Sequence, residues 1–183
     1  MPRLFTALEV PAAVAQNLSM LRGGLPGARW IEPSDYHVTL RFLGDIDDAQ
    51  AHDVALELDS IRRPPISVTI ESLSAFGGSR PRAIVALVRS TNELEALQAD
   101  HERAARRAGL SPEPRKFTPH VTLARLRSSG SFGVAEYLTT RGLFTQRSYD
   151  IDRFLLYSSR ASTGGGPYLV EAEYPLDEPD LTV

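Results

Sequence analysis

Alternating and helically spaced apolar residues divide this chain into strands and helices. Segments in which every second residue is apolar predict strands, because successive side chains of a strand point to opposite faces. Apolar residues three and four positions apart predict helices instead. We expect strands over 3–8, 28–31, 36–43, 66–73, 82–87, 149–158 and 168–174, a further strand that begins at His120, and a turn over 163–167. We expect helices between Pro11 and Gly23, over 51–61, over 92–108 and over 133–141.

One tetrapeptide, His-Val-Thr-Leu, occurs twice, at residues 37–40 and 120–123. The chain has only 4 histidines, so half of them lie in this repeated context. In a strand each histidine emerges on the same face as the threonine two positions later, whereas the valine and leucine face a core. Packing accounts for a repeated valine and leucine, but it does not require matching polar residues on the other face. We therefore interpret the two motifs as a functional pair.

The duplication extends beyond the tetrapeptides. Segments 3–8 and 82–87 carry Arg, Ala and Leu at matching positions, and each precedes a predicted helix and then a histidine motif. The copies lie 79 residues apart at these segments and 83 apart at the histidines, which is consistent with an old duplication. The pattern predicts an α+β fold with two pseudo-symmetric lobes, each an antiparallel sheet with helices outside, around a central cleft. We expect a single bilobal domain over 1–183, with repeats of approximately 1–80 and 81–176 and an acidic tail at 177–183.

Composition narrows the class of protein. The chain is 42% hydrophobic and 23% charged, without a long run of charge, as is typical of one globular domain or two closely packed lobes. It has no cysteine, which excludes disulfides, a thiolate nucleophile and thiolate metal ligands. No apolar run is long enough to span a bilayer, so we expect a cytoplasmic protein. The net charge of -3 indicates that any nucleic acid is gripped locally, as a nucleotide or a strand end would be.

Two imidazoles and two hydroxyls in one cleft are suited to acid–base chemistry on a phosphate ester. One neutral imidazole can accept a proton while the other, as imidazolium, donates one. The hydroxyls can hold the non-bridging oxygens as charge develops. In-line displacement needs the two catalytic groups on opposite sides of phosphorus, and two related strands provide this arrangement. The pattern does not indicate which histidine is the acid, but a pair working in opposite protonation states predicts a bell-shaped pH profile.

The other two histidines and the glycine-rich stretches give weaker evidence of a functional site. His52 and His101 lie among polar residues on predicted helices, and we expect both at the surface. His52 with Asp53 is similar to the His-Asp pair of metal-dependent phosphohydrolases, but those proteins are all-helical and this chain is rich in predicted strands. Neither Gly77-Gly78 nor the later glycine run has the lysine or the helix that a phosphate loop needs. No metal and no other cofactor is expected.

The paired motifs identify a family. With the first motif continuing as Arg-Phe-Leu-Gly at 41–44, the chain resembles the two-histidine (2H) phosphoesterases. It resembles the bacterial and archaeal RNA 2',3'-cyclic phosphodiesterases, the LigT-like branch, at residues 4–8, 27–30, 117–120 and 156–160. The resemblance covers nearly the whole chain except the acidic tail.

This resemblance implies a bilobal fold with a water-filled groove and metal-independent hydrolysis of an RNA or nucleoside 2',3'-cyclic phosphate to a 2'-phosphate. It implies that His37 and His120 are the acid–base pair and that Thr39 and Thr122 bind phosphate oxygens. The partners would be RNA 3' ends or nucleotides that carry the cyclic phosphate. The family is also associated with joining tRNA halves through a 2',5' linkage, which is the reverse reaction.

Substrate contacts beyond these four residues are less determined. Simple alternation places Arg41 on the face of His37 but Arg125 on the face opposite His120. The resemblance nevertheless implies that Arg125 lies near the phosphate, and a bulge or twist after Thr122 would reconcile the two expectations. Aromatic candidates for stacking on a base, each with the core as its alternative place, are Phe5, Phe42, Tyr157 and Tyr168.

Two other functions remain open at this point. The same cleft could belong to a non-catalytic module that binds a cyclic or terminal phosphate at an RNA end. The same chemistry could act on another ligand, such as the cyclic phosphate of ADP-ribose or a 2',5'-linked oligonucleotide. Because one chain contains the whole predicted cleft, we expect a monomer.

Overall fold

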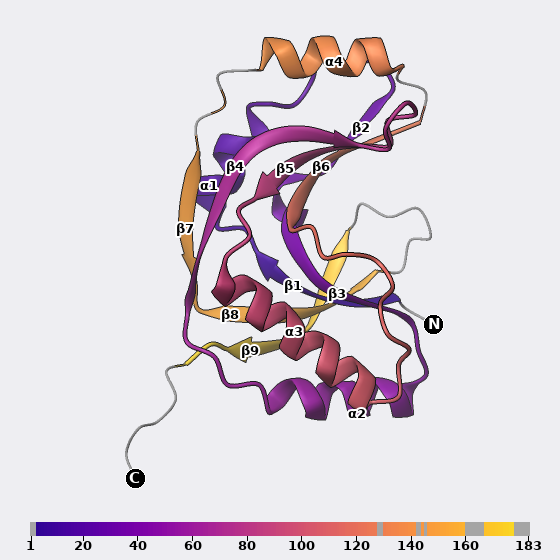
Figure 1. Cartoon of the computed structure of the whole chain (residues 1–183), viewed down its shortest axis with the longest axis vertical. Coiled ribbons are helices and arrows are strands. Elements are labelled where there is room, and N and C mark those ends of the chain that lie inside the picture. The colour runs from indigo at the N-terminus through magenta and orange to yellow at the C-terminus, as the bar shows by residue number, and fades with distance from the viewer. Residues whose placement is uncertain (1–2, 128–129, 142–143, 145, 160–166, 178–183) are drawn as a thin grey trace.

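The computed structural model describes residues 3–127, 130–141, 144, 146–159 and 167–177, and these form an α+β protein built on one large sheet (Figure 1). The sheet runs in the order β7-β4-β5-β6-β3-β1-β8-β9, with β2 paired beside β6. Its strands are β1 (Arg3–Glu9), β2 (Ala28–Trp30), β3 (His37–Asp45), β4 (Ile66–Phe76), β5 (Ala83–Val88), β6 (His120–Leu126), β7 (Arg147–Ile151), β8 (Arg153–Ser159) and β9 (Tyr168–Pro175). The helices are α1 (Ala12–Ser19), α2 (Asp48–Asp59), α3 (Asn92–Arg107) and α4 (Ser131–Thr140), with a short 3-10 turn at Pro33–Asp35.

The strand order reveals the predicted pseudo-symmetry. β3 and β6, which carry the two histidine motifs, lie next to each other at the middle of the sheet. Each is flanked on its outer side by the first strand of its own repeat, β1 or β5. Within the described residues β3 and β6 pair at one position, Val38 with Val121, which is the same position of the two motifs. The approximate twofold axis therefore passes between the motifs, and the two halves of the sheet diverge from this point.

Each half of the sheet is covered by helices from both repeats. α3 of the second repeat packs beside α2 and against β3 of the first repeat. In Figure 1 these two helices lie together at one end of the molecule, and α4 lies at the other. α4 in turn contacts the first repeat, because the Tyr137 hydroxyl donates a hydrogen bond to the Leu21 carbonyl at 2.6 Å. This exchange of helices ties the two halves to each other away from the narrow central junction.

The predicted core is confirmed at the two motifs. Val38, Leu40, Val121 and Leu123 are all buried at 3% exposure or less, while the histidines and threonines between them are only partly buried.

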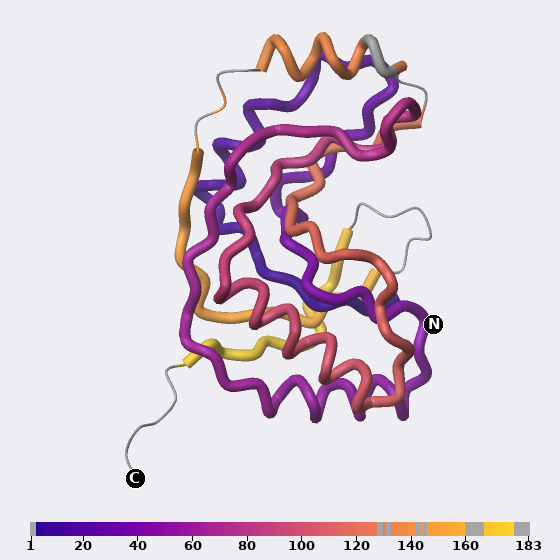
Figure 2. The backbone as a smooth tube through the Cα atoms, in the orientation of Figure 1, coloured from indigo at the N-terminus to yellow at the C-terminus, as the bar shows by residue number. Residues whose placement is uncertain are grey.

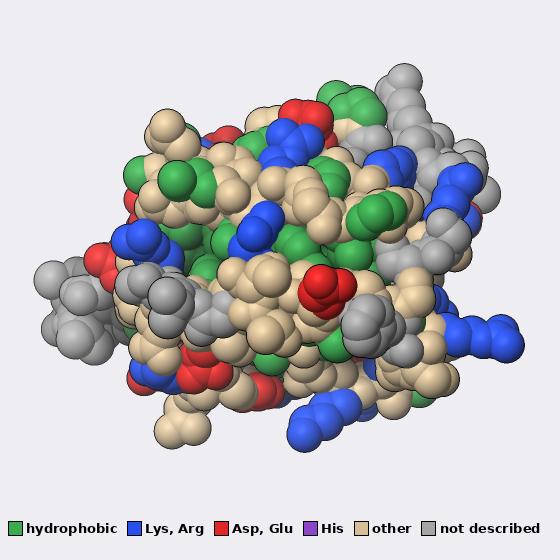
Figure 3. Space-filling view, turned by 90° about the horizontal axis from the view of Figure 1, so that it is seen from above, with side chains coloured by type: hydrophobic (Ala, Val, Ile, Leu, Met, Phe, Trp, Pro, Cys, Tyr) green, Lys and Arg blue, Asp and Glu red, His purple; other side chains and the backbone are tan. Residues whose placement is uncertain are grey.

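Among the described residues, no helix is long and apolar enough to cross a membrane. The end of the molecule seen in Figure 3 carries cationic, anionic and hydrophobic side chains side by side, without a patch of one charge.

The expected single strand over 149–158 is wrong. The chain leaves the sheet at Asp152, and the segment becomes two strands with different partners. β7 pairs with β4 at one edge, whereas β8 pairs with β1 in the other half. Figure 2 shows this stretch passing along one side of the molecule from one half to the other. Apolar residues occur on both sides of the break, so the composition of the segment does not reveal the change of partner. The expected turn at 163–167 falls almost entirely on residues 160–166, which lie outside the described part.

The surface position expected for His101 is also wrong. Its side chain is 1% exposed, its Nδ1 lies 2.8 Å from the Thr6 hydroxyl, and its ring meets Phe154 edge-on at 4.4 Å. The charged neighbours in sequence lie on other faces of α3. His101 instead shares the buried face with Leu97, one helical turn earlier. His52 is exposed, as expected.

Candidate active site

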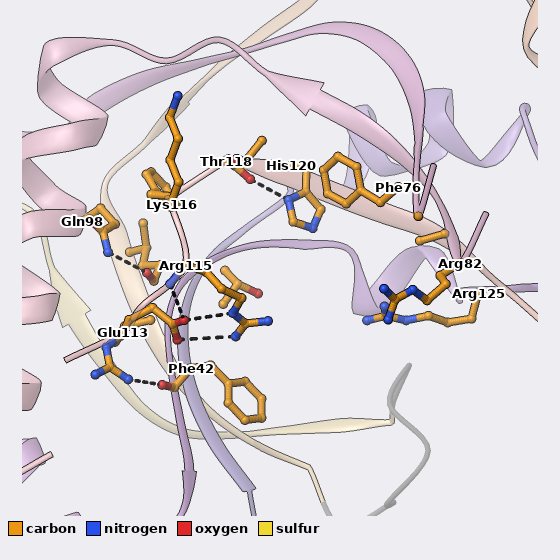
Figure 4. Close-up of a pocket in the computed structure, with 16 residues that line it drawn as sticks. Phe42, Phe76, Arg82, Gln98, Glu113, Arg115, Lys116, Thr118, His120 and Arg125 are labelled. Atoms are coloured by element: carbon orange, nitrogen blue, oxygen red, sulfur yellow. Dashed lines mark hydrogen bonds and ion pairs between the residues drawn. The ribbon is translucent and has the colours of Figure 1, made fainter. Parts of the chain in front are cut away.

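The two motif histidines are held in the same way. The Nδ1–H group of His37 donates to the Asp35 carbonyl at 2.8 Å, and that of His120 donates to the Thr118 carbonyl at 2.7 Å. A carbonyl oxygen only accepts hydrogen bonds, so each neutral ring carries its proton on Nδ1. Nε2 of each ring is then the atom that remains to accept or donate a proton; Figure 4 shows the ring of His120 with its bond to Thr118. Sequence reasoning did not anticipate this backbone carbonyl two residues before each histidine.

The two histidines line neighbouring cavities between the halves of the sheet. His120 borders a cavity of about 530 Å³, and His37 borders an adjoining cavity of about 130 Å³. Thr39, Phe42 and Arg125 line both cavities, so these three residues form the boundary between them. The two motifs therefore face neighbouring cavities that share three lining residues.

Matched β-bulges change the strand faces after each motif. The pairing of β3 with β1 skips Leu40, and the pairing of β6 with β5 skips Leu123. A bulge adds one residue to one strand, so the alternation of side chains shifts beyond it. Arg125 consequently joins His120 on the cleft face, as the bulge hypothesis required. Phe42, five residues after His37, takes the equivalent position in the first repeat and is 41% exposed.

Simple alternation is wrong for Arg41. The bulge turns this side chain away from His37, and it is only 6% exposed. Its guanidinium forms an ion pair with the Glu102 carboxylate and donates to the carbonyls of Phe42 and Ser111, the latter at 2.6 Å. Burial acts to raise the pKa of Glu102, but the hydrogen bonds from Arg41, from the Glu113 backbone and from another arginine hold that pKa below its usual range. Arg41 thus ties β3 to α3 and to the loop before His120.

Aromatic rings surround the histidines. The ring of Phe5 lies 5.0 Å from that of His37, with Tyr168 at 5.1 Å and Tyr157 at 5.9 Å. Phe5 and Tyr168 also line the smaller cavity, and Phe42 lies between the two cavities. On the other side Phe76 meets His120 edge-on at 4.7 Å. Phe76 did not stand out in the sequence, because it ends an apolar strand.

The surroundings lower the pKa of both histidines. Burial is the main cause for His37, and together with the positive charges of His120 and Arg125 it lowers the pKa to about 4 against the opposing hydrogen bond to Asp35. Burial also lowers the pKa of His120, helped by Arg125 and opposed by Thr118. The free site therefore favours two neutral imidazoles. A bound anion next to both rings would favour the imidazolium form and restore an acid to the pair.

The remaining predicted residue, Thr122, is partly buried and lies two positions after His120 on the same strand face. The described residues contain no group of three or more His, Cys, Asp or Glu side chains arranged to hold a metal ion. Thr122 lines neither of the two cavities, so the groups around them are the two oriented imidazoles, the Thr39 hydroxyl and the Arg125 guanidinium. These groups can move protons and hold an anion.

Comparison with known proteins agrees with the geometry. The family model described as LigT like Phosphoesterase matches the chain twice, over residues 8–86 and 85–168. This chain belongs to the LigT-like phosphoesterase family. An Aquifex aeolicus relative, named RNA 2',3'-cyclic phosphodiesterase, is 31% identical over 153 residues, which are 81% of each chain. A Thermotoga maritima relative with the same name is 29% identical over 176 residues, or 92% of each chain.

Solved structures show the same fold. E. coli LigT, crystallised with 3'-AMP, superposes on this LigT-like protein with a TM-score of 0.76 at 24% identity, covering 96% of this chain and 99% of that one. A Thermus thermophilus protein gives a TM-score of 0.77 at 20% identity, with 96% and 98% coverage. The two matches of the family model agree with the duplication that the histidine motifs indicated.

Proposed function

We propose that this phosphoesterase hydrolyses the 2',3'-cyclic phosphate of RNA 3' ends or nucleosides and leaves a 2'-phosphate. The observation that carries the proposal is the matched pair of imidazoles, each with Nδ1–H bound to a backbone carbonyl and each bordering one of two neighbouring cavities that share Thr39, Phe42 and Arg125. The names of the relatives support this choice of substrate.

The reaction follows from the groups in the cleft. One neutral imidazole takes a proton through Nε2 from a water molecule, whose oxygen forms a bond to phosphorus. The P–O3' bond breaks on the opposite side, and the other histidine, as imidazolium, gives its Nε2 proton to the departing O3'. Thr39, Thr122 and Arg125 hold the non-bridging oxygens as negative charge grows on them. The reaction written in this way uses no metal ion.

The alternatives have less support. Family membership and the presence of both oriented histidines favour an enzyme over a non-catalytic module that binds RNA ends. The cleft chemistry also suits the cyclic phosphate of ADP-ribose, and the reverse reaction would join RNA ends through a 2',5' linkage. We further propose that the protein acts in the cytoplasm and as a monomer, since one chain supplies both histidines.

The test is conversion of cytidine 2',3'-cyclic phosphate in the presence of a chelator, with the product identified by chromatography. We expect cytidine 2'-phosphate as the product. His37→Ala and His120→Ala should each lower kcat by roughly 10²- to 10⁴-fold. His52→Ala, which removes an exposed histidine, is the matched control and should leave kcat unchanged. A 3'-phosphate product would show that the wrong leaving oxygen has been assigned, and full activity in both histidine variants would refute the mechanism.

A further inference from the structure

The larger cavity contains more positive charge than a cyclic phosphate can neutralise. Five cationic side chains line it, of which two are paired: Arg41 with Glu102 and Arg115 with Glu113. The other three cations lining it are Arg82, Lys116 and Arg125. Within the described part of the chain, none of these three has a carboxylate partner. A 2',3'-cyclic phosphate is a diester with one negative charge, so the cavity can bind a second anionic group.

The backbone of Arg82 is held by two hydrogen bonds. Its backbone N–H donates to the Phe76 carbonyl at 2.7 Å, and its carbonyl accepts from the Leu126 N–H at 2.8 Å. These bonds hold Arg82 between the ends of β4 and β6. Arg125, on β6, pairs with Ala83, the residue after Arg82. Figure 4 shows both guanidinium groups turned into the same cavity.

The turn before Arg82 requires a glycine. Gly77 has a φ of +113°, in the region that residues with a side chain rarely adopt. A Cβ added there would lie 2.4 Å from the Arg80 carbonyl oxygen and 2.8 Å from the Arg82 nitrogen. The backbone that carries Arg82 is therefore compact and well determined. Because the backbone at Arg82 is fixed, only the side chain loses conformational freedom when an anion arrives.

The two arginines have different surroundings. Arg125 borders both cavities and acts on the charge of both histidines, which suits contact with the reacting phosphate. Arg82 borders the larger cavity, next to Phe76 and Gly77. The smaller cavity, near His37, shares Arg125 but adds no further unpaired cation among the described residues, since its Arg3 faces Asp45 at 3.8 Å. The unpaired cations other than Arg125, namely Arg82 and Lys116, thus lie on the His120 side of the cleft.

We infer that Arg82 forms a subsite for a second phosphate, namely the one on the 5' oxygen of the ribose that bears the cyclic phosphate. In an RNA strand this group is the last internucleotide phosphodiester, and in a mononucleotide it is a 5'-phosphate. Guanidinium groups match the geometry of phosphate oxygens, and such charge-assisted bonds are among the stronger hydrogen bonds in proteins. The inference rests on the proposed function and specifies which substrates the enzyme prefers.

The test compares three substrates: cytidine 2',3'-cyclic phosphate, the same nucleotide with a 5'-phosphate, and a dinucleotide ending in the cyclic phosphate. At low salt we expect kcat/KM to be about tenfold higher for the two substrates with a second phosphate. Arg82→Gln should bring this ratio close to one. Arg80→Gln removes the same charge from an exposed position in the same turn and should leave both the ratio and the basal activity unchanged.

The substrates also distinguish the source of the phosphate. A gain for the dinucleotide identifies an RNA end, and a gain for the 5'-phosphate alone identifies a mononucleotide. For the dinucleotide, the slope of log KM against log salt should fall by about 0.7 in Arg82→Gln, as expected for one lost phosphate contact on a single strand. Three results would overturn the inference: equal kcat/KM of the wild type for substrates with and without the second phosphate, a preference that persists in Arg82→Gln, or an equal loss of the preference in Arg80→Gln.

Binding measurements keep this test separate from the proposed function. If the wild-type protein hydrolysed none of the substrates, the proposed function would fail, but calorimetry could still measure the subsite. We expect cytidine 2',5'-bisphosphate to bind about tenfold more tightly than cytidine 2'-phosphate, and Arg82→Gln to remove the difference. Equal affinities of the wild-type protein for the two ligands would show that Arg82 does not bind a second phosphate.

Discussion

Replacing Arg41 tests whether the bulge in β3 places this side chain in the core and not in the cleft. Arg41→Ala removes a buried cation from Glu102 and leaves the carbonyls of Phe42 and Ser111 without their guanidinium donor. Breaking a buried ion pair by removing one partner costs about 3–5 kcal/mol. Glu102 keeps hydrogen bonds from Arg106 and from a backbone N–H, so we expect the lower end, a loss of about 3 kcal/mol in the free energy of unfolding.

The matched comparison is Arg125→Ala, which removes an exposed arginine from the equivalent stretch of β6. Urea denaturation should show a change of no more than about 0.5 kcal/mol in this variant. Its kcat on cytidine 2',3'-cyclic phosphate should fall by roughly 10²-fold, because it loses a group that holds phosphate oxygens. The folded fraction of Arg41→Ala should instead keep a KM close to that of the wild type.

The opposite pattern would refute the reasoning. If Arg41→Ala were as stable as the wild type and raised KM strongly, the guanidinium would reach the substrate, as simple alternation along β3 suggests. A double variant, Arg41→Met with Glu102→Leu, provides a further check, since apolar replacement of a buried ion pair is often neutral. It should recover much of the stability that Arg41→Ala loses.

Three further outcomes are expected. Because burial lowers the pKa of His37 to about 4 and of His101 to about 3, the unfolded chain binds protons more readily than the folded one below pH 6.5. The free energy of unfolding from urea denaturation should therefore fall as the pH drops from 6.5 to 5, by roughly 1 kcal/mol per pH unit for each histidine, and a flat profile would contradict these pKa values. Gly77→Ala should cost about 1–3 kcal/mol in thermal or urea unfolding, because its Cβ would meet the Arg80 carbonyl, and unchanged stability would show that the turn adapts. Thr39→Val should lower kcat by roughly 10²-fold with little effect on folding, and full activity would remove this hydroxyl from the mechanism.

The sequence predicts the motif strands well because their pattern is local. Alternation along a strand correctly separates Val38 from His37, and the duplication correctly pairs β3 with β6. Alternation fails one residue beyond each motif, where a bulge shifts the side chains. A bulge arises from the pairing of two strands, so the sequence of one strand does not reveal it. Only the implied place of Arg125 near the phosphate pointed to it.

Burial in the helices was harder to predict. His101 has charged neighbours in sequence, and these suggested a solvated helix face. Its spacing of four from Leu97 was the available signal, and it indicated the buried face correctly. The break at Asp152 gave no comparable signal, because apolar residues occur on both sides of it. Which partner each strand finds depends on the packing of the whole sheet.

The duplication also explains how a symmetric scaffold can bind an asymmetric substrate. The Nδ1–H groups of the two histidines make equivalent hydrogen bonds to backbone carbonyls. The residue five positions after the histidine, however, is Phe42 in the first repeat and Arg125 in the second. Aromatic rings therefore gather on the His37 side, and unpaired cations gather on the His120 side. A nucleotide has an aromatic base and anionic phosphates, so this difference gives the cleft a preferred orientation for its substrate.

The most direct test of the account is whether His37 and His120 contact one phosphate group. Imidazole ¹⁵N resonances can be followed by NMR during titration with cytidine 2'-phosphate, with assignments from His37→Gln and His120→Gln and with exposed His52 as an internal control. We predict that the Nε2 signals of both motif histidines shift along a single binding curve that saturates at one equivalent, while His52 does not respond. Movement of only one histidine, or two separate curves, would contradict the convergence of the two imidazoles on one phosphorus atom.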